Sequence, residues 1–384
     1  MLKCSPFPRC KSVGVSLLML VSLLAGSPMT AQAQPQTPAA LAFTSSNVKL
    51  SGGLVIHSSP TLADLTGDGL PEILIGTTAQ NGASGNQPNR PMYLTAVRSN
   101  DNILWSAPVD APINSSPAVA DIDGDGQPEV LVTTGGDVSD RKRQGSLIAF
   151  DRSGNLRWRF TTLDDVPKDG NPDGAFSSPT LCDVDGDGKL EIAFGGWDRQ
   201  IYLINHDGSP RWNNLNSYPG TPARPGYHNA DTVWSTAACA DLNNDGKNEI
   251  IIGADITGGG SLPDGTRTQN GGFLYVFDGN GNVLVRRFLD EAIFSSPAVA
   301  DLDNDGVLEI VVGTSYYWWN ESGRSKTNYV YAFRTNNVFS GLPYADPAKL
   351  PNAPGWPQST PYPGFSSPAI GDLDNDGDLE VVIA

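Results

Sequence analysis

The chain has 384 residues, including 42 Gly and 30 Pro, and its glycines follow no three-residue period, which excludes a collagen-like protein. Hydrophobic residues make up 39% and aromatic residues 8%, which is enough for a packed core and argues against wholesale disorder. The formal net charge of −17 argues against nucleic acid, or an anionic membrane, as a partner of the bulk surface.

Residues 1–33 have the pattern of a secretory signal peptide. Three basic residues precede an apolar run at 13–26, and a small-x-small cleavage site ends at Ala33, so we expect a mature N-terminus at Gln34. The apolar run is about 14 residues long, whereas a membrane span needs about 20, and no later segment could cross a bilayer. We therefore expect an exported, secreted or periplasmic protein without membrane insertion. Its net charge would change from −17 to −20 when the three basic residues leave.

One pattern recurs six times between residues 51 and 384. Each copy has Ser-Ser-Pro or a close variant, a run of small residues, an acidic loop and an apolar triplet. The first acidic residues of the copies are Asp64, Asp121, Asp183, Asp241, Asp301 and Asp372. They are separated by 57, 62, 58, 60 and 71 residues, so the chain is a repeat protein with a period near 60.

Each repeat predicts four β-strands. The small residues form a first strand, and the apolar triplet forms a second that is buried on both faces. A third strand is apolar and aromatic, and after a Gly/Asn turn a fourth strand carries Trp105, Trp158 or Trp212, which we assign to the core. Four-stranded units buried on both faces must stack, which predicts an all-β protein with a β-propeller fold. The alternative, a pair of β-sandwiches, would not repeat one motif at even spacing.

The sixth copy reaches only its second strand before Ala384. We therefore expect an incomplete sixth blade and a C-terminal truncation, with a natural six-bladed closure as the alternative. Residues 34–50 are assigned to a linker whose segment 41–50 is a candidate ring-closing strand.

The turn between the first and second strands reads D-x-[D/N/T]-x-D-G-x-x-E in all six repeats. It offers side-chain oxygens at positions 1, 3 and 5, a backbone carbonyl at position 7 and a carboxylate at position 9, which suits Ca²⁺. An EF-hand is excluded because an apolar strand residue stands at position 12, where an EF-hand has Glu.

The candidate metal ligands occupy positions 1, 3, 5, 7 and 9 of each loop. In chain order they are Asp64, Thr66, Asp68, Leu70, Glu72, Asp121, Asp123, Asp125, Gln127, Glu129, Asp183, Asp185, Asp187, Lys189, Glu191, Asp241, Asn243, Asp245, Lys247, Glu249, Asp301, Asp303, Asp305, Val307, Glu309, Asp372, Asp374, Asp376, Asp378 and Glu380. Positions 1, 3, 5 and 9 contain 22 of the 42 acidic residues, which would repel one another in a metal-free Asp-Gly turn, the disfavoured alternative. We expect up to six Ca²⁺ ions, with the first loop the weakest because of Thr66.

These loops resemble the FG-GAP, or VCBS-type, repeat of the integrin α-subunit N-terminal β-propeller and of bacterial secreted relatives. The resemblance covers residues 51–384 and implies a propeller of about seven blades, calcium in the inner hairpins, and a role in adhesion or ligand binding. Integrin-like loops commonly carry Asp at position 9, where this chain has Glu, a change that leaves metal binding intact. Neither an Arg-Gly-Asp motif nor an integrin head partner domain is visible, so a specifically integrin-like role is not implied. The third and fourth strands also resemble, more weakly, the quinoprotein propeller repeat.

The long loops lie mainly on the face opposite the acidic loops and carry arginine and aromatic residues, which are typical anchors of a binding surface. The alternative is that the aromatic rings only pack their own loops. The candidate ligand-binding residues are Arg143, Tyr227, Tyr316, Trp318 and Trp319. His228 and Asp231 could form a catalytic pair, although such a pairing is common by accident.

The predicted function is that of a non-enzymatic, calcium-stabilised propeller that binds a protein or a glycan outside the cell. The alternative is an extracellular enzyme such as a polysaccharide lyase or a quinoprotein. No nucleophile motif, phosphate loop or convincing acid/base pair outside the acidic loops supports that alternative.

Cys182 and Cys239 are the cysteines that remain after the leader. We expect two separately buried thiols, because cysteine is among the most buried residue types. A disulfide, which an oxidising compartment would permit, is the alternative.

Overall fold

The computed structural model describes residues 2–3, 11–12, 50, 55, 57–78, 92–136, 145–165, 170, 172–213, 224–262, 264–315, 317–318, 328–360 and 366–383. This part of the chain contains 24 β-strands and one short 3₁₀ turn, η1 (Pro347–Lys349). None of its helical segments is long and apolar enough to cross a membrane.

The strands form six four-stranded sheets. The first contains β3 (Thr61–Ala63), β4 (Glu72–Gly76), β5 (Met92–Val97) and β6 (Ile103–Val109). The second contains β7 (Ala118–Ala120), β8 (Glu129–Thr134), β9 (Ser146–Phe150) and β10 (Leu156–Thr161). The third contains β11 (Thr180–Cys182), β12 (Glu191–Gly195), β13 (Gln200–Ile204) and β14 (Tyr227–His228). The fourth contains β15 (Ala238–Ala240), β16 (Glu249–Ile256), β17 (Gly271–Phe277) and β18 (Val283–Leu289). The fifth contains β19 (Ala298–Ala300), β20 (Glu309–Gly313), β21 (Asn328–Arg334) and β22 (Gln358–Thr360).

The sixth sheet differs from the others in origin. It pairs β23 (Ala369–Gly371) and β24 (Glu380–Val382) with β1 (Leu2–Lys3) and β2 (Lys11–Ser12), in the order β2-β1-β24-β23. The third and fourth strands that the repeat pattern leaves out of this blade are thus replaced by two strands from the segment expected to be a signal peptide. The rest of that segment, and all of the candidate ring-closing strand except Leu50, lie outside the described residues.

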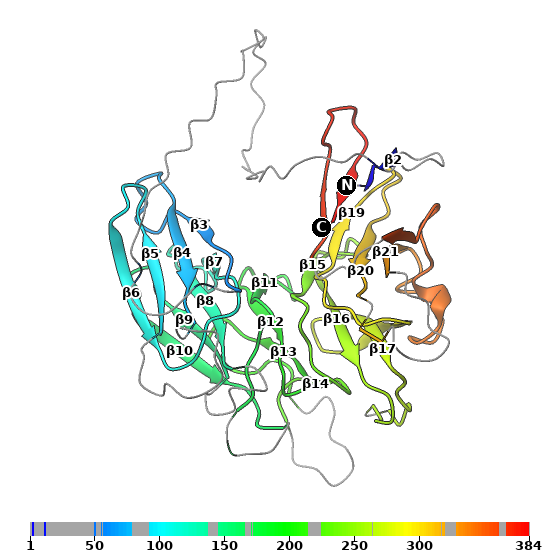
Figure 1. Ribbon diagram of the computed structural model, residues 1–384, viewed down its shortest axis with the longest axis horizontal. Helices are drawn as coiled ribbons and strands as arrows, with labels where there is room; N and C mark the ends of the chain where they lie inside the picture. The colour runs from blue at the N-terminus through cyan, green and yellow to red at the C-terminus, as the bar shows by residue number, and fades with distance from the viewer. Residues whose placement is uncertain are drawn as a thin grey trace.

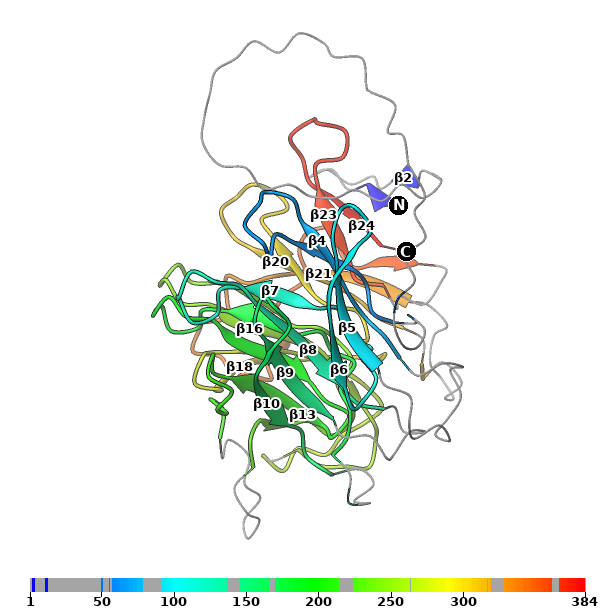
Figure 2. The same cartoon turned by 90° about the vertical axis from the view of Figure 1, so that its left-hand side faces the viewer.

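The sheets follow one another around an open arc as the blades of a propeller (Figures 1 and 2). A separate apolar cluster fills each of the five joints between neighbouring blades. The second strand of a blade contributes to both of its joints: Val130 and Val132 pack toward the first blade, and Leu131 packs toward the third. All six residues of β8 are buried, as a continuous apolar run in the middle of a stack requires. The predicted all-β propeller architecture is confirmed.

The first blade has an exposed outer face. Leu62 and Ile73 are opposite each other in the pairing of β3 with β4 and are 50% and 38% exposed. The equivalents of Ile73 in the next blades, such as Val130 and Ile192, are fully buried. Among the described residues, no further blade packs on this face.

The Ser-Ser-Pro motif links neighbouring blades by hydrogen bonds near their innermost strands. The backbone N–H of Ser59 donates to Ser116 Oγ in the next blade, and the N–H of Ser116 donates to Ser178 Oγ, at 3.3 and 2.9 Å. The same bond continues through Thr236, Ser296 and Ser367 at 3.0 to 3.1 Å. We refer to this series of six residues as the serine ladder. It gives the second residue of each motif a structural role that the sequence alone did not indicate.

Tryptophan side chains make a second, outer link between blades. The indole N–H of Trp105 donates to the carbonyl of Arg152 in the next blade, and that of Trp158 donates to His206, both at 2.9 Å. Trp212 repeats the bond to Gly279 at 3.2 Å. The assignment of these rings to the core is confirmed for all three, which pack in the clusters between blades.

The strand assignment of Trp212 is wrong, however. The fourth strand of its blade is β14, and Trp212 lies beside the end of β13, where its backbone N–H donates to the carbonyl of Leu203. The chain between the two strands is long in this blade, so the outermost position of the sheet is filled by a later segment.

Cys182 and Cys239 form a disulfide, with their Cα atoms 6.1 Å apart. The expectation of two separate thiols is therefore wrong. Cys182 is on β11 and Cys239 is on β15, so the bond joins the innermost strands of the third and fourth blades.

Candidate metal centres in the inner hairpins

Every acidic loop connects the first and second strands of its blade, and two left-handed residues shape it. Position 6 is glycine throughout, with φ between 82° and 92°. Position 4 is glycine in the first three loops and asparagine in the last three, with φ between 55° and 78°. Asparagine is one of the few side-chain-bearing residues that adopt this conformation readily. The sequence signal for this second left-handed position is the restriction of position 4 to Gly or Asn.

The aspartate at position 1 organises the loop backbone. In the second loop, Asp121 Oδ1 accepts the N–H of Gly124 at 2.8 Å, and Oδ2 accepts the N–H of Gly126 at 2.7 Å. The bond from the position-6 N–H to Oδ2 recurs in all six loops at 2.7 to 3.0 Å. In Asp64, the bond from the Gly69 N–H is the main reason why the pKa of the carboxyl lies below its usual value.

The glutamate at position 9 is buried in every loop, with no more than 4% of its surface exposed. One carboxylate oxygen, Oε2, accepts the N–H of the position-2 residue at 2.8 to 3.2 Å in all six loops. This bond fixes the carboxylate across the hairpin and leaves Oε1 as the oxygen that is available to a cation.

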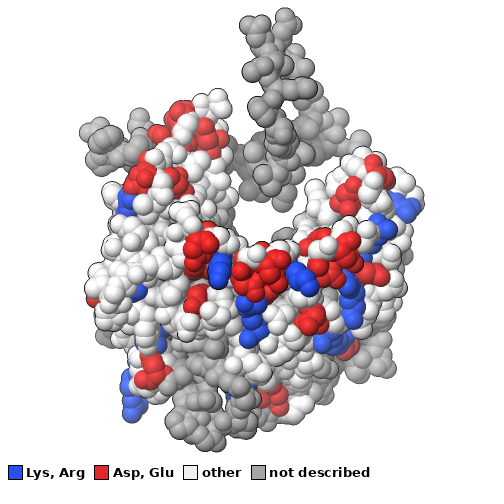
Figure 3. Space-filling view, turned by 180° about the vertical axis from the view of Figure 1, so that it is seen from behind, with Lys and Arg blue, Asp and Glu red and all other residues white. Residues whose placement is uncertain are grey.

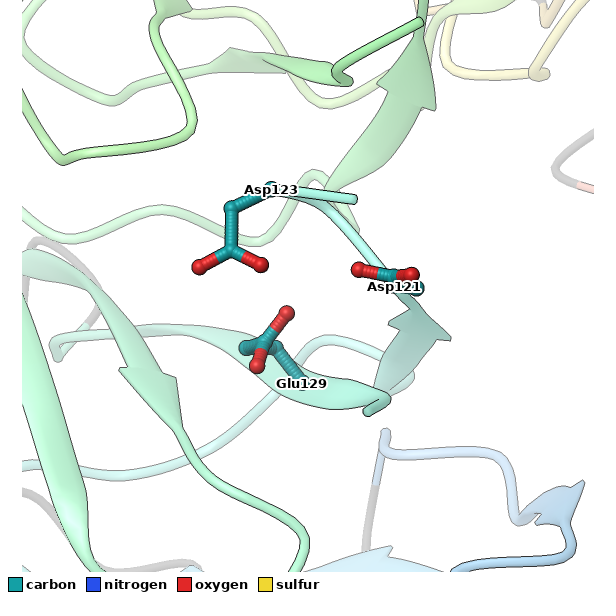
Figure 4. Close-up of side chains that lie close together, drawn as sticks. All are labelled: Asp121, Asp123 and Glu129. Atoms are coloured by element: carbon teal, nitrogen blue, oxygen red, sulfur yellow. The ribbon is translucent and has the colours of Figure 1, made fainter. Parts of the chain in front are cut away.

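Carboxylates from positions 1, 3 and 9 converge in four of the loops. Figure 4 shows Asp121, Asp123 and Glu129 facing one another across the β7–β8 hairpin. In each of these loops, one oxygen from each residue lies within 4.8 Å of the others. The corresponding triads are Asp183, Asp185 and Glu191; Asp301, Asp303 and Glu309; and Asp372, Asp374 and Glu380. The first and fourth loops form no such triad of acids because Thr66 and Asn243 stand at position 3.

The aspartate at position 5 is turned toward its own loop. Its Oδ1 accepts the N–H of the position-7 residue at 2.7 to 3.1 Å in all six loops. The position-7 residues are Leu70, Gln127, Lys189, Lys247, Val307 and Asp378. Their carbonyl groups remain predicted ligands.

The electrostatics of the buried glutamates suit a cation. Burial raises the pKa of Glu249 and of Glu309 to about 7, and it also raises the pKa of Glu129 and Glu191. Glu309 Oε1 is buried and has no hydrogen-bond partner among the described residues. A divalent cation at this position would satisfy that oxygen and favour the ionised carboxylate, so the residues present fit a metal.

Three arginines that the sequence did not single out reach into these loops. Arg157 pairs with Asp123 and Glu129, and Arg211 pairs with Asp185 and Glu191. Arg334 pairs with Asp303 and Asp305. Figure 3 shows the result from outside: acidic side chains run along the concave edge of the arc, with basic side chains beside them.

The candidate ligand-binding residues have different surroundings. Arg143, Tyr316 and Trp319 lie outside the described residues. Tyr227 is only 7% exposed and packs against Tyr275 and Phe277 of the fourth blade, so it belongs to the core rather than to the surface. Burial also raises its pKa to about 12.

Trp318 is half-buried at one end of a row of aromatic rings. Five successive ring–ring contacts make up the row, with ring centroids 4.6 to 5.7 Å apart. Its members, from the third blade to the fifth, are Phe176, Trp197, Trp234, Phe294, Tyr317 and Trp318. We call this set the aromatic row. Phe176, Trp234 and Phe294 each stand directly before the Ser-Ser or Ser-Thr pair that begins a repeat. They therefore lie at the start of the innermost strands, and the acidic loops lie at the other end of these strands.

A buried and a half-buried carboxyl group lie close to this row. Burial raises the pKa of Asp255 to about 7, and the charge of Asp231 acts in the same direction. Burial also raises the pKa of Asp231, which accepts hydrogen bonds from Thr232 N–H and from the Thr257 hydroxyl. The ring of His228, the residue suggested as a catalytic partner of Asp231, forms a hydrogen bond with the side chain of Gln200, 2.9 Å away.

Two families of repeats match parts of the chain. The FG-GAP-like repeat matches residues 183–252, and the FG-GAP repeat matches residues 114–149. These segments cover the acidic hairpins of the second, third and fourth blades.

Among curated proteins, a lambda-carrageenase from Pseudoalteromonas carrageenovora is 23% identical over 231 residues, which cover 58% of this chain and 21% of the enzyme. The chain thus spans about a fifth of the length of that relative.

Similar solved structures include the C-terminal domain of PilY1 from Pseudomonas aeruginosa, with 13% identity, 85% of this chain and 82% of that one covered, and a TM-score of 0.48. A quinohemoprotein alcohol dehydrogenase from Pseudomonas putida HK5 has 11% identity, coverages of 84% and 55%, and a TM-score of 0.47.

The assignment of the chain rests on its own repeats. Both family matches include acidic loops of a motif that recurs six times, and all six copies share the same loop hydrogen bonds. This chain carries FG-GAP repeats, matched at residues 114–149 and 183–252, on a β-propeller fold.

Proposed function

We propose that this protein is an extracellular, non-catalytic propeller that calcium stabilises and that binds a glycan or protein ligand. The observation that supports the metal most directly is the convergence of position-1, position-3 and position-9 carboxylates within 4.8 Å in four loops of identical register. Oxygen-only ligands, a carbonyl at position 7 and a flexible loop suit Ca²⁺ better than Mg²⁺, which demands near-ideal octahedral geometry.

Calcium would contribute to stability by binding only the folded hairpins. Extracellular calcium modules have Kd values of roughly 10⁻⁴ to 10⁻³ M, so millimolar calcium contributes about 0.4–1.4 kcal/mol per site. Several sites together would add several kcal/mol, which is comparable with the stability of a whole domain.

The metal assignment is tested by elemental analysis and thermal melting of the purified protein. We expect bound calcium, a large fall in Tm in excess chelator, and recovery with Ca²⁺ far better than with Mg²⁺. Asp125→Ala and Asp187→Ala should each reproduce part of the fall, and Thr66→Ala should change Tm least. An unchanged melting curve in chelator, together with no bound calcium, would refute the assignment.

The aromatic row supports the ligand-binding part of the proposal. Phe176, Trp234, Phe294 and Trp318 are half-buried rather than fully packed, and Tyr317 is 55% exposed. Partly exposed aromatic rings that come from several blades are typical anchors of a recognition surface.

A glycan and protein array probed with the calcium-loaded protein would identify the ligand class. Trp318→Ala should weaken the binding that the array finds and leave the fold intact. Phe339→Ala, which removes an exposed ring outside the aromatic row, is the matched control. If Trp318→Ala unfolds the protein instead, the ring serves only to pack its loop, and the surface assignment is lost.

An extracellular enzyme is the second candidate. It is favoured by the similarity to a lambda-carrageenase and by the Asp231–Asp255 pair, whose raised pKa values suit a general acid. Release of reducing ends from carrageenan or other polysaccharides, abolished by Asp255→Asn, would establish this candidate over the first.

The extracellular location rests on two features. The Cys182–Cys239 disulfide is typical of proteins in oxidising compartments, and the N-terminal segment has the pattern of a signal peptide. The acidic surface makes nucleic acid an unsuitable partner.

A further inference from the structure

Arg157 contacts two of the three carboxylates that converge in the second loop. It extends from β10 of the same blade, and its Nη2 lies 2.7 Å from Asp123 Oδ2. Its Nη1 pairs with Glu129 Oε1. The other carboxylate oxygen, Oε2, accepts the N–H of Ile122 at 3.1 Å, so the guanidinium holds the glutamate oxygen that this backbone bond leaves free.

The same arrangement recurs in the third loop. Arg211 Nη2 lies 2.8 Å from Asp185 Oδ2, and Nη1 lies 3.4 Å from Glu191 Oε1. The two arginines thus contact the same two positions of the motif, 3 and 9, in consecutive blades.

The arginine of the fifth loop comes from yet another part of its blade. Arg334 is the last residue of β21, the third strand of its blade, and not of the fourth. Its Nη1 lies 3.2 Å from Asp303 Oδ2, its Nη2 pairs with Asp305, and its Nε lies 4.0 Å from Glu309 Oε1. Arg157 comes from β10, Arg211 from the segment that follows β13, and Arg334 from β21, so three structural origins place the same chemical group beside the position-3 and position-9 carboxylates.

In the first five loops, an arginine is present where the residue at position 3 is charged and absent where that residue is neutral. The loops that have it carry Asp123, Asp185 or Asp303 there. The first and fourth loops carry the neutral Thr66 and Asn243, and neither has an ion pair within the described part of the chain. Four carboxylates with one guanidinium, or three carboxylates alone, leave the same net charge of −3 at positions 1, 3, 5 and 9.

We propose that Arg157, Arg211 and Arg334 are tethered competitors of the bound cation, which divide these five acidic loops into two classes. This inference rests on the proposed binding of calcium. A guanidinium and a divalent cation cannot share the position-3 carboxylate, because both are positive and both need the same oxygens. In the second and third loops they would also need the same Glu Oε1. Cation binding to the second, third and fifth loops therefore displaces the arginine. The first and fourth loops have no such competitor.

The two classes of loop differ in how well their hairpins persist when the calcium concentration falls. The second, third and fifth loops, which we call the arginine loops, keep an internal positive charge and hold their hairpins without metal. The first and fourth loops depend on the cation alone. Charge-assisted Arg–carboxylate pairs are strong, but these guanidinium groups are 19% to 34% exposed, which weakens them. We expect the competition to weaken calcium binding by about tenfold in each arginine loop.

The test is a calcium titration of the full-length protein and of the triple variant Arg157→Gln, Arg211→Gln, Arg334→Gln. Equilibrium dialysis against ⁴⁵Ca²⁺ counts the sites filled at each free concentration. In the variant, we expect three sites to bind about tenfold more tightly than in the wild type. We also expect a lower Tm in chelator, because the internal cation is gone, and therefore a larger rise in Tm on adding calcium.

Arg159→Gln is the matched control. Arg159 lies two residues from Arg157 on the same strand, but it pairs with Asp110, 2.6 Å away and outside the acidic loops. Its removal should leave the calcium titration unchanged.

The outcomes separate this inference from the calcium assignment. Unchanged or weaker binding by the triple variant would overturn the competition and make the arginines plain supports of the loops. An absence of calcium binding by both proteins would refute the calcium assignment itself. If the triple variant fails to fold, Arg157→Gln alone should tighten one site, and failure to do so overturns the proposal.

Discussion

Cys182 and Cys239 face each other across the joint between the third and fourth blades. Their disulfide links β11 to β15, the innermost strands, and the cysteines are 57 positions apart in sequence. Cys182 is nearly fully buried, and Cys239 packs on the same apolar cluster. The bond thus reinforces a joint that the serine ladder and a tryptophan already hold.

Removing this disulfide should destabilise the protein substantially. By the chain-entropy relation, a closed loop of this length is worth about 4 kcal/mol, within a typical range of about 2–4. The Cys182→Ala, Cys239→Ala variant should melt at least several degrees below the wild type. Addition of a reductant should lower the Tm of the wild type and leave the double variant unchanged; a wild-type Tm insensitive to full reduction would contradict the assigned role.

The contact between Trp105 and Gly154 makes a second prediction. A Cβ on Gly154 would lie 2.7 Å from Cδ2 of the Trp105 ring, and the residue has a φ of 82°. Gly154→Ala should therefore separate the outer edges of the first two blades and lower the Tm markedly. Gly265→Ala is the matched control because Gly265 has the same φ of 82° but no atom within 4 Å of an added Cβ. Equal losses in the two variants would show that backbone strain alone is responsible.

The serine ladder can be tested at its second joint. Ser178→Ala removes the acceptor of the Ser116 N–H, and an unsatisfied donor in a partly buried joint costs about 1–2 kcal/mol. Ser178→Thr should be tolerated because Thr236 fills the equivalent place in the next blade. Ser153→Ala, in an exposed turn, serves as the control. Comparison of denaturant midpoints would measure the difference, and no loss in Ser178→Ala would show that the ladder does not stabilise the joint.

Asp255 should make stability fall as pH rises. Burial raises its folded-state pKa from 3.8 to about 7, so between these values the folded protein holds a proton that the unfolded chain has lost. Rising pH therefore favours the unfolded chain until about pH 7, after which the effect is constant. Each unit of difference between the folded-state and unfolded-state pKa values corresponds to about 1.4 kcal/mol of unfolding free energy.

The variant Asp255→Asn lacks this ionisation. Its Tm advantage over the wild type should grow between pH 5 and pH 8, whereas Asp101→Asn, at an exposed site, should show no such trend. A constant difference across this pH range would mean that the carboxyl is ionised throughout.

The repeat pattern predicted the blades and the acidic hairpins because both depend on local spacing. Glycine at position 6 and the buried second strand reappear in every copy, so six weak signals reinforce one another. The disulfide does not follow from the burial tendency of each cysteine alone, because it depends on where the two residues stand in the repeat. Cys239 is equivalent in the repeat to Leu181, one residue before the equivalent of Cys182. Neighbouring residues of a strand point to opposite faces, so in stacked blades this offset turns the two cysteines toward each other.

The arginines and Tyr227 could not be placed from the sequence for a different reason. Arg157 lies 28 residues from Glu129, on an outer strand, and only the sheet pairing brings it to the hairpin. Arg334 reaches an equivalent position from another strand, so no fixed spacing identifies the group. Tyr227 lies in a long connection that pattern analysis treats as a surface loop, but its short strand β14 pairs with β13 and covers the core.

The serine ladder runs in a single direction, since each N–H donates to the hydroxyl of the following repeat. Every donor and acceptor in it belongs to the same motif position, so one joint is chemically interchangeable with another. Duplication or loss of a whole repeat in the gene would therefore restore the same bond between the new neighbours. A protein built in this way can change its number of blades through unequal recombination without having to evolve a new interface.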